Sequence, residues 1–510
     1  MIDAMIEGLL HIDPLTLGLM SIAVVFSTII AVIPGLGGIF ALVLVMPFTL
    51  TLDNPIMAVA ILVSITAVTG NGDSVTGILF GVPGSPTGLA TVFDGYPMAQ
   101  NGEAGRALGA ALTAAAVGGV IGGIVLAVLI PVVRPLVLLI GPAEFTVLIA
   151  TALVFVSTIG GGDTLRSLMA GASGLAVSLV GQEPSTAALR YTGESLYLFG
   201  GIRLVPLMIG LFAVAEMIKL TQQSGSIANI EPGEVVDPRK GMKRGVLDVF
   251  RYWRATLESS LTGLGIGIVP GMGGDVASLL AYSRVSRFAK EKERFGKGAV
   301  EGVIASDAAQ NSKSGGAFVP TLAFGVPGSA SMAIMLSAFA SLGFFPGEAM
   351  LTTDLDIFWL VVWALIIANL MATGLILAVV KPLAQLTFVK TSLLVPPILV
   401  ISVYGSFAST NHVGDILTVA AAGLIGYAMM ALGYSRTTFV IGFVLGAPLE
   451  RQFLLTQRLY GWSFIERPGV QIILAIFALS ILIPLVRRVI RRREGAVDLP
   501  TATPRSEEVE

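Results

Sequence analysis

Apolar runs without a single charged residue recur along this chain, and they constrain its fold more than any other feature. They include Leu15 to Ile33, Ala107 to Ile130, Ile357 to Val380 and Val470 to Val486. A hydrocarbon core about 30 Å thick needs about 20 apolar residues in a helix. Of the 510 residues, 54% are hydrophobic and only 13% are charged, against about a quarter charged in soluble domains. We therefore predict an all-α polytopic protein of the lipid bilayer, with about ten to fourteen full or partial crossings.

The same composition excludes several function classes. The chain has no cysteine and only two histidines, His11 and His412, so we expect no transition-metal site. No GxxxxGK[ST] motif is present, which argues against an ATP-driven pump. A membrane-embedded enzyme would need a nucleophile with a base, or a metal cluster, and the two histidines form neither. We expect no enzyme, no cofactor and no nucleic-acid partner.

Clusters of basic residues predict how the chain crosses the membrane. They lie at 239–254, at 284–297 and in "RRVIRRRE" from Arg487, and the positive-inside rule makes all three cytoplasmic, the C-terminus included. The first two clusters flank the apolar stretch Ala255 to Ser283, which "PGMGG" interrupts at Pro270 to Gly274. Because both flanks should be cytoplasmic, we predict a hairpin or broken-helix pair that enters the membrane and returns.

Two motifs occur once in each half of the chain and in the same order. "VIPGLGGIFALV" at 32–43 aligns with "IVPGMGGDVASL" at 268–279, and "FGVPGS" occurs at 80–85 and again at 324–329. The flanks of the first motif are acidic or lack basic residues, so this copy should enter from the opposite side, as in an inverted-topology repeat. We predict a first repeat at 1–220, a cytoplasmic connection at 221–254, a second repeat at 255–490 and a disordered cytoplasmic tail at 491–510.

The repeated Gly-Pro loops predict a binding site within the membrane. Such sequences break helices, and freed backbone groups are tolerated in hydrocarbon only where they are buried in protein or line a polar cavity. Half-helix N-termini suit an anion, whereas unwound carbonyls and side-chain oxygens suit Na⁺. The expected substrate contacts are Asn71, Gly84, Ser85, Thr87, Asn311, Lys313, Gly328, Ser329 and Ser331. The expected contacts of a coupling ion are Pro34, Gly35, Gly37, Asp73, Gly271, Gly273, Asp275 and Asp307.

Two alternatives stay open at this point. The loops could be packing kinks or turns outside the membrane. Lys313 could pair either with a substrate carboxylate or with Asp307.

Three longer segments resemble a known family. They are "GILFGVPGSPTGLATVFDGYPMAQNGEAGRALGAAL" at 77–112, "PGMGGDVASLLAY" at 270–282 and "EGVIASDAAQNSKSGGAFVPTLAFGVPGSASMAIML" at 301–336. Together they resemble the large membrane subunit of tripartite tricarboxylate transporters, the TctA family. The resemblance runs through nearly the whole chain to about residue 490. One departure is that Gln310 precedes Asn311 and Lys313 follows, where the family often has an acidic residue and paired asparagines.

The resemblance implies a secondary transporter of a bacterial-type inner membrane, and we hypothesise an elevator-like or rocking mechanism. It implies two protein partners, a small four-helix membrane subunit (TctB-like) and a periplasmic substrate-binding protein (TctC-like). The implied cargo is a tricarboxylate or related carboxylate, and the implied driving force is a Na⁺ or H⁺ gradient. A channel with similar loops is the rival interpretation, and uptake that fails to saturate would favour it.

Overall fold

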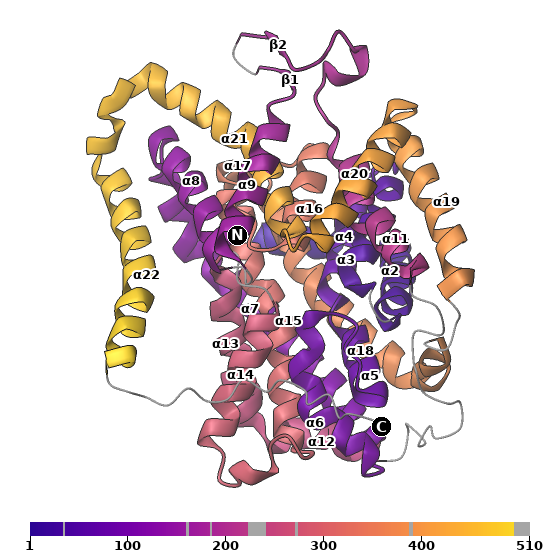
Figure 1. Cartoon of the computed structure of the whole chain (residues 1–510). Coiled ribbons are helices and arrows are strands. Elements are labelled where there is room, and N and C mark those ends of the chain that lie inside the picture. Colours follow the sequence, from indigo (N-terminus) through magenta and orange to yellow (C-terminus); the bar gives the residue numbers. More distant parts are fainter. Residues whose placement is uncertain are drawn as a thin grey trace.

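The computed structural model describes residues 1–33, 36–159, 163–183, 186–222, 241–270, 274–386 and 391–493, and these residues are mostly helical (Figure 1). The elements up to residue 222 are α1 (Ile2–Leu10), α2 (Pro14–Val32), α3 (Gly37–Thr49), α4 (Pro55–Val68), α5 (Asn71–Phe80), η1 (Pro86–Gly88), α6 (Leu89–Gln100), α7 (Ala104–Leu138), α8 (Pro142–Ile159), α9 (Thr164–Ser178), β1 (Gly181–Gln182), β2 (Leu189–Arg190), η2 (Leu196–Leu198), α10 (Leu204–Met208), the π-helical η3 (Ile209–Val214) and α11 (Ala215–Thr221).

The elements of the second half follow the same helical pattern. They are α12 (Met242–Arg251), α13 (Trp253–Ile268), α14 (Gly274–Phe288), η4 (Lys292–Arg294), α15 (Val300–Phe324), α16 (Ala330–Ser341), α17 (Glu348–Thr352), α18 (Leu355–Leu386), α19 (Thr391–Thr410), α20 (Gly414–Ala431), α21 (Arg436–Tyr460), η5 (Gly461–Glu466) and α22 (Pro468–Arg493). Among the described residues, seven helices are long and apolar enough to cross a membrane, and shorter apolar helices accompany them. The chain is therefore an all-α multi-pass membrane protein, while the exact number of crossings stays a prediction.

Two helices of the first half begin where a capping side chain precedes a proline. Asp13 Oδ1 accepts a hydrogen bond from the backbone N of Thr16 at 2.7 Å, and α2 begins at Pro14. Asn54 Oδ1 accepts one from the backbone N of Ile56 at 3.0 Å, and α4 begins at the next residue. A proline fits the first helical position because its missing N–H would have no helical acceptor there.

The Gly-Pro motif of the second half separates two helices that form a hairpin. The helices α13 and α14 pack against each other, and their outer ends, near Arg254 and Phe288, line one cavity. The chain therefore returns to the end at which it entered, which is the hairpin form that the flanking basic residues predict. In Figure 1 this end carries α6 and α12, whereas β1 and β2 project from the opposite end.

The long helix α15 lies at the centre of the fold and contacts both halves of the chain. It packs against α7, α13, α14 and α6. Its contact with α7 is backbone against backbone, because a Cβ added to Gly118 would lie 2.3 Å from the carbonyl oxygen of Ala308. A Cβ added to Gly315 would lie 2.4 Å from the backbone of Gly122. Glycines on both helices thus bring α15 into direct contact with the first half, as in closely packed membrane helices.

The two halves also exchange contacts through their Gly-Pro hairpins. In the first half, α2 and α3 flank the Gly-Pro motif and pack against each other as the first hairpin, and α3 packs against α16, which follows the second "FGVPGS". The second arm of the other hairpin, α14, packs against η1 and α6, which follow the first "FGVPGS". Each arm therefore contacts the segment that follows the repeated hexapeptide of the other half.

The domain boundaries stay predictions. Within the expected connection at 221–254, the structure describes α12 and the start of α13, while residues 223–240 lie outside the described residues. Most of the expected tail, residues 494–510, also lies outside them.

Candidate functional site

Both copies of "FGVPGS" break a helix in the same way. Gly81 ends α5 with φ of 69°, and Gly325 ends α15 with φ of 60°, a left-handed conformation that glycine adopts without strain. Ser85 and Ser329 are then extended, with φ of −145° and −157°, and each precedes the next helical turn. The expected breaks are therefore present at both copies, and each brings a serine to the start of a new helical segment.

The two breaks of the first half meet each other. A Cβ added to Gly84 would lie 2.9 Å from the carbonyl oxygen of Ala31, near the end of α2. A Cβ on Gly37, whose φ is 63°, would lie 3.5 Å from Ser85 Cβ. In the second half, a Cβ on Gly328 would lie 3.8 Å from Pro270 Cα. In each half, the hexapeptide therefore lies against the Gly-Pro hairpin.

Asp73 is the buried carboxylate at the first break. Its Oδ2 accepts a hydrogen bond from Ser85 Oγ and another from Thr87 Oγ1, the latter at 2.8 Å. Its Oδ1 is buried and has no hydrogen-bond partner among the described residues. A Cβ on Gly84 would lie 2.5 Å from this oxygen, so only glycine allows the backbone of the break to approach the carboxylate this closely.

Gln310 joins the site from α15. Its Nε2 donates to Thr87 Oγ1 at 2.8 Å, which links it to Asp73 through one hydroxyl. Its own Oε1 is buried without a hydrogen-bond partner in the part of the chain that the structure describes. On the other side, Ser278 Oγ of α14 donates to the carbonyl oxygen of Thr87 at 3.0 Å. Side chains of α5, α14 and α15 therefore hold the loop at Thr87. Two of these side chains, Asp73 and Gln310, each keep one acceptor oxygen without a partner among the described residues.

Asp307, the second buried carboxylate, differs from Asp73 in that both of its oxygens are bonded. Ser74 Oγ donates to Oδ1, and Thr91 Oγ1 donates to Oδ2 at 2.9 Å. Thr91 Oγ1 also lies 2.8 Å from Ser306 Oγ. Because its donors lie on α5 and α6, Asp307 ties α15 to the first half.

Three asparagines form a chain next to these carboxylates. Asn311 Nδ2 donates to Asn71 Oδ1 at 2.6 Å and to Asn369 Oδ1 at 2.9 Å. Asn369 Nδ2 donates to the carbonyl oxygen of Leu365 at 2.8 Å within α18. Asn71 Nδ2 is buried and has no acceptor among the described residues. The cluster thus offers one free amide donor beside two free oxygens.

The remaining expected site residues are placed but not joined to this cluster by the contacts described above. Ser329 Oγ accepts from the backbone N of Met332 at 3.4 Å and caps α16, and Ser331 lies half-buried in the first turn of that helix. Lys313 lies half-buried on α15. Whether Lys313 pairs with a substrate carboxylate or with Asp307 stays a prediction.

Part of the expected ion site lies outside the described residues. This holds for Pro34, Gly35, Gly271 and Gly273. Asp275 is the second residue of α14, and its side chain also lies outside what the structure describes.

Sequence reasoning missed several members of the cluster. Ser74 and Thr91 were not singled out, and neither was Asn369, which stands in the apolar run of α18. A lone amide in a spanning helix usually faces the interior of a bundle, and this signal could have identified Asn369. Thr91 carries no comparable signal, because threonine is common on helix surfaces and often bonds its own helix.

A second polar group lies at the junction of α1 and α18. Glu7, His11 and Asp356 bring three ligand-type atoms within 4.8 Å of one another. His11 Nε2 lies 3.0 Å from Asp356 Oδ2, and Trp363 Nε1 donates to the carbonyl oxygen of Met5 at 3.1 Å. These contacts hold α1 against α18.

The free groups of the central cluster define its chemistry. Asp73 Oδ1 and Gln310 Oε1 are hard oxygen ligands of the kind that bind Na⁺ and other hard cations. Asn71 Nδ2 is a donor suited to a carboxylate oxygen. The described cluster therefore combines an acceptor side for a cation with a donor side for an anion.

Comparison with known proteins adds a family to this geometry. The family model "Tripartite tricarboxylate transporter TctA family" matches residues 17–441. A protein of Agrobacterium vitis described as "Uncharacterized 52.8 kDa protein in TAR-I ttuC' 3'region" is 27% identical over 482 residues, which cover 93% of this chain and 94% of that protein. Another from Agrobacterium vitis, "Uncharacterized protein in TAR-II ttuC' 3'region", is 27% identical over 232 residues, covering 45% of this chain and 96% of that protein. No solved structure matches the chain significantly.

Proposed function

The chain belongs to the tripartite tricarboxylate transporter TctA family, and from that membership we propose that it imports a tricarboxylate or related carboxylate with a cation gradient. Membership implies a subunit of a tripartite transporter. In this proposal it lies in the inner membrane of a bacterial-type cell with its C-terminus in the cytoplasm. It works with a small TctB-like membrane subunit and a TctC-like periplasmic protein that captures the substrate.

The coupling ion in this proposal is Na⁺, bound at Asp73. The observation that carries the assignment is the buried, unpartnered Oδ1 of Asp73, which the backbone of Gly84 approaches closely. An uncompensated buried carboxylate oxygen is costly, and a bound cation removes that cost. The second free oxygen, Oε1 of Gln310, belongs to an amide, which does not take up a proton near neutral pH. An amide ligand therefore favours a metal cation over a proton.

The substrate in this proposal binds beside the ion, at the donor side of the cluster. Asn71 supplies the free amide donor, Asn311 holds Asn71 in place and is itself held by Asn369, and Ser85 lies at the first break. The start of α16, with Gly328 and Ser329, supplies the positive end of a helix dipole that suits a carboxylate. A bound Na⁺ next to the substrate lowers the cost of bringing its negative charge into the membrane.

Alternating access in this proposal comes from the inverted repeat. Its support is the exchange of contacts in which α3 packs against α16 while α14 packs against η1 and α6. Such reciprocal packing is expected of two repeats related by an axis in the membrane plane. Movement of one Gly-Pro hairpin pair past the other, elevator-like or rocking, would then expose the site to each side in turn.

Uptake by variants tests the substrate assignment. Purified chain is reconstituted in proteoliposomes with its two partner proteins, and initial uptake of radiolabelled citrate is measured. We expect Asn311→Ala to reduce uptake at least tenfold, because it removes two buried hydrogen bonds worth about 1 kcal/mol each. Without these bonds Asn71 and Asn369 are no longer held together. Thr352→Ala, at the last residue of α17, should leave uptake unchanged and serves as the control. Wild-type uptake by both Asn311→Ala and Ser329→Ala would show that the substrate binds elsewhere.

A further inference from the structure

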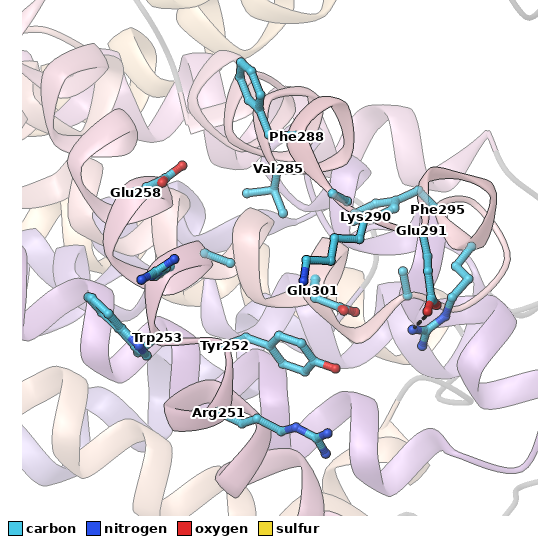
Figure 2. A pocket seen from close by; sticks show the side chains of 15 residues that line it. Arg251, Tyr252, Trp253, Glu258, Val285, Phe288, Lys290, Glu291, Phe295 and Glu301 are labelled. Atoms are coloured by element: carbon cyan, nitrogen blue, oxygen red, sulfur yellow. Dashed lines mark hydrogen bonds and ion pairs between the residues drawn. The ribbon is translucent and has the colours of Figure 1, made fainter.

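A cavity of about 620 Å³ lies at the basic end of the molecule, away from the central cluster (Figure 2). The junction of α12 and α13 forms one wall, with Tyr252 and Arg254. The end of α14 and the loop after it form the other, with Phe288 and Lys290. Glu301, at the start of α15, also lines the cavity, and Figure 2 shows Tyr252, Lys290 and Glu301 around its middle.

The charges around this cavity are only partly paired. Arg294 is bonded to Glu291 at 3.1 Å, but the ion pairs of the described residues leave Arg251, Arg254 and Lys290 without a carboxylate. Glu301 Oε2 is buried and has no hydrogen-bond partner among the described residues. The cavity therefore presents cationic groups at its mouth and one unsatisfied anionic oxygen inside, which suits a ligand that carries both a phosphate and an amine.

An exposed apolar stripe runs from the cavity along α13. Trp253, Leu257 and Leu261 follow at intervals of four, so they share one face of the helix, and their exposed fractions are 56%, 39% and 50%. Phe288, 74% exposed, lies at the end of α14 across the cavity. Exposed leucines below a tryptophan and several arginines are the pattern of a helix that passes from acyl chains to the headgroup region.

We propose that this cavity binds the headgroup of an ethanolamine phospholipid of the cytoplasmic leaflet, with an acyl chain along the Trp253, Leu257 and Leu261 stripe. Arg254 and Lys290 hold the phosphate, and the primary ammonium donates to Glu301 beside the ring of Tyr252. A choline headgroup has no N–H and leaves the Glu301 oxygen unsatisfied, so the site discriminates between two lipids of equal net charge.

Lipid binding to the purified, delipidated full chain tests this proposal, with native mass spectrometry as the readout. We expect phosphatidylethanolamine to bind about tenfold more tightly than phosphatidylcholine. The double variant Arg254→Gln, Lys290→Gln should weaken both lipids about thirtyfold, since each basic residue contributes roughly fivefold at a membrane surface. Glu301→Gln should remove the preference between the lipids. Arg287→Gln, an exposed basic residue of α14 outside the cavity, is the matched control and should change nothing.

Several results would overturn the proposal. Equal binding of the two lipids by the wild-type chain would show that Glu301 does not select the headgroup. If Arg287→Gln weakens lipid binding as much as the double variant does, the effect comes from net charge and not from the cavity. Glycerophosphoethanolamine binding as tightly as the lipid would assign the cavity to a soluble ligand. Loss of the lipid on addition of the small membrane subunit would assign the stripe to a protein. A circular dichroism spectrum and elution volume like those of the wild type show that each variant is folded, and transport is not part of the readout.

Discussion

Removal of the charge should affect the two buried carboxylates differently, with little change in stability for Asp73→Asn and a loss for Asp307→Asn. Both hydroxyl donors of Asp73, from Ser85 and Thr87, reach the same oxygen, Oδ2. In Asp73→Asn, the amide oxygen can occupy that position and keep both hydrogen bonds, with its NH₂ group where the unpartnered Oδ1 was. The two hydrogen bonds become weaker because their acceptor is no longer charged, but the cost of burying a charge also disappears. We therefore expect the free energy of unfolding to change by about 1 kcal/mol or less.

Asp307→Asn has no such arrangement. Ser74 donates to one oxygen and Thr91 to the other, so the amide must set its NH₂ group against a hydroxyl donor. Loss of one charge-assisted hydrogen bond leaves a buried hydroxyl to find another partner, and we expect a loss of about 1–3 kcal/mol. Asp307→Asn should therefore unfold at a lower temperature than Asp73→Asn.

Stabilisation by Na⁺ should also distinguish the two variants, because Asp307→Asn should keep it and Asp73→Asn should lose it. A ligand at 100 times its dissociation constant stabilises the folded state by about 2.7 kcal/mol. We expect NaCl, compared with KCl at equal ionic strength, to raise the thermal midpoint of the wild type and of Asp307→Asn, and to leave that of Asp73→Asn unchanged. The reasoning is refuted if Asp73→Asn keeps the Na⁺ shift, or if the two variants are destabilised equally without Na⁺.

Three further outcomes are expected. Gly84→Ala should abolish the Na⁺ shift, because its Cβ would lie 2.5 Å from the free carboxylate oxygen, while Gly265→Ala, with nothing within 4 Å, should keep it. Burial raises the pKa of Tyr197 to about 12 from 10.0, so stability that is present below pH 10 should fall between pH 10 and 12. Denaturant titrations across that range should show a smaller fall for Tyr197→Phe. Single cysteines at Lys297 and Leu196, both exposed, should react with impermeant maleimide from opposite sides of the membrane; labelling of both from one side would contradict the proposed orientation.

The coarse fold and part of the site could be predicted from the sequence for clear physical reasons. Uncharged runs of spanning length allow little except helices across a membrane, and glycine with proline marks the places where those helices break. Asn71, Asp73, Asp307 and Asn311 stood out because polar groups in apolar surroundings need partners.

The partners themselves could not be predicted in the same way. Nothing in the sequence shows that Thr87 bonds both Asp73 and Gln310, because that depends on how closely α15 approaches the first half. The packing of α15 against the first half also makes two similar carboxylates different. Asp73 keeps one oxygen without a partner among the described residues, whereas both oxygens of Asp307 are bonded. The helix α12 and the cavity beside it also escaped notice, because basic residues were interpreted only as markers of membrane orientation.

The most direct test of the central claim is uptake of radiolabelled citrate into proteoliposomes that contain the chain with its membrane and periplasmic partners. An inward Na⁺ gradient should drive accumulation above the external concentration, with an initial rate that saturates with substrate, and Asp73→Asn should abolish it. Accumulation driven equally by a proton gradient without Na⁺ would contradict the ion assignment. Uptake that never exceeds the external concentration and does not saturate would contradict the carrier itself and favour a channel.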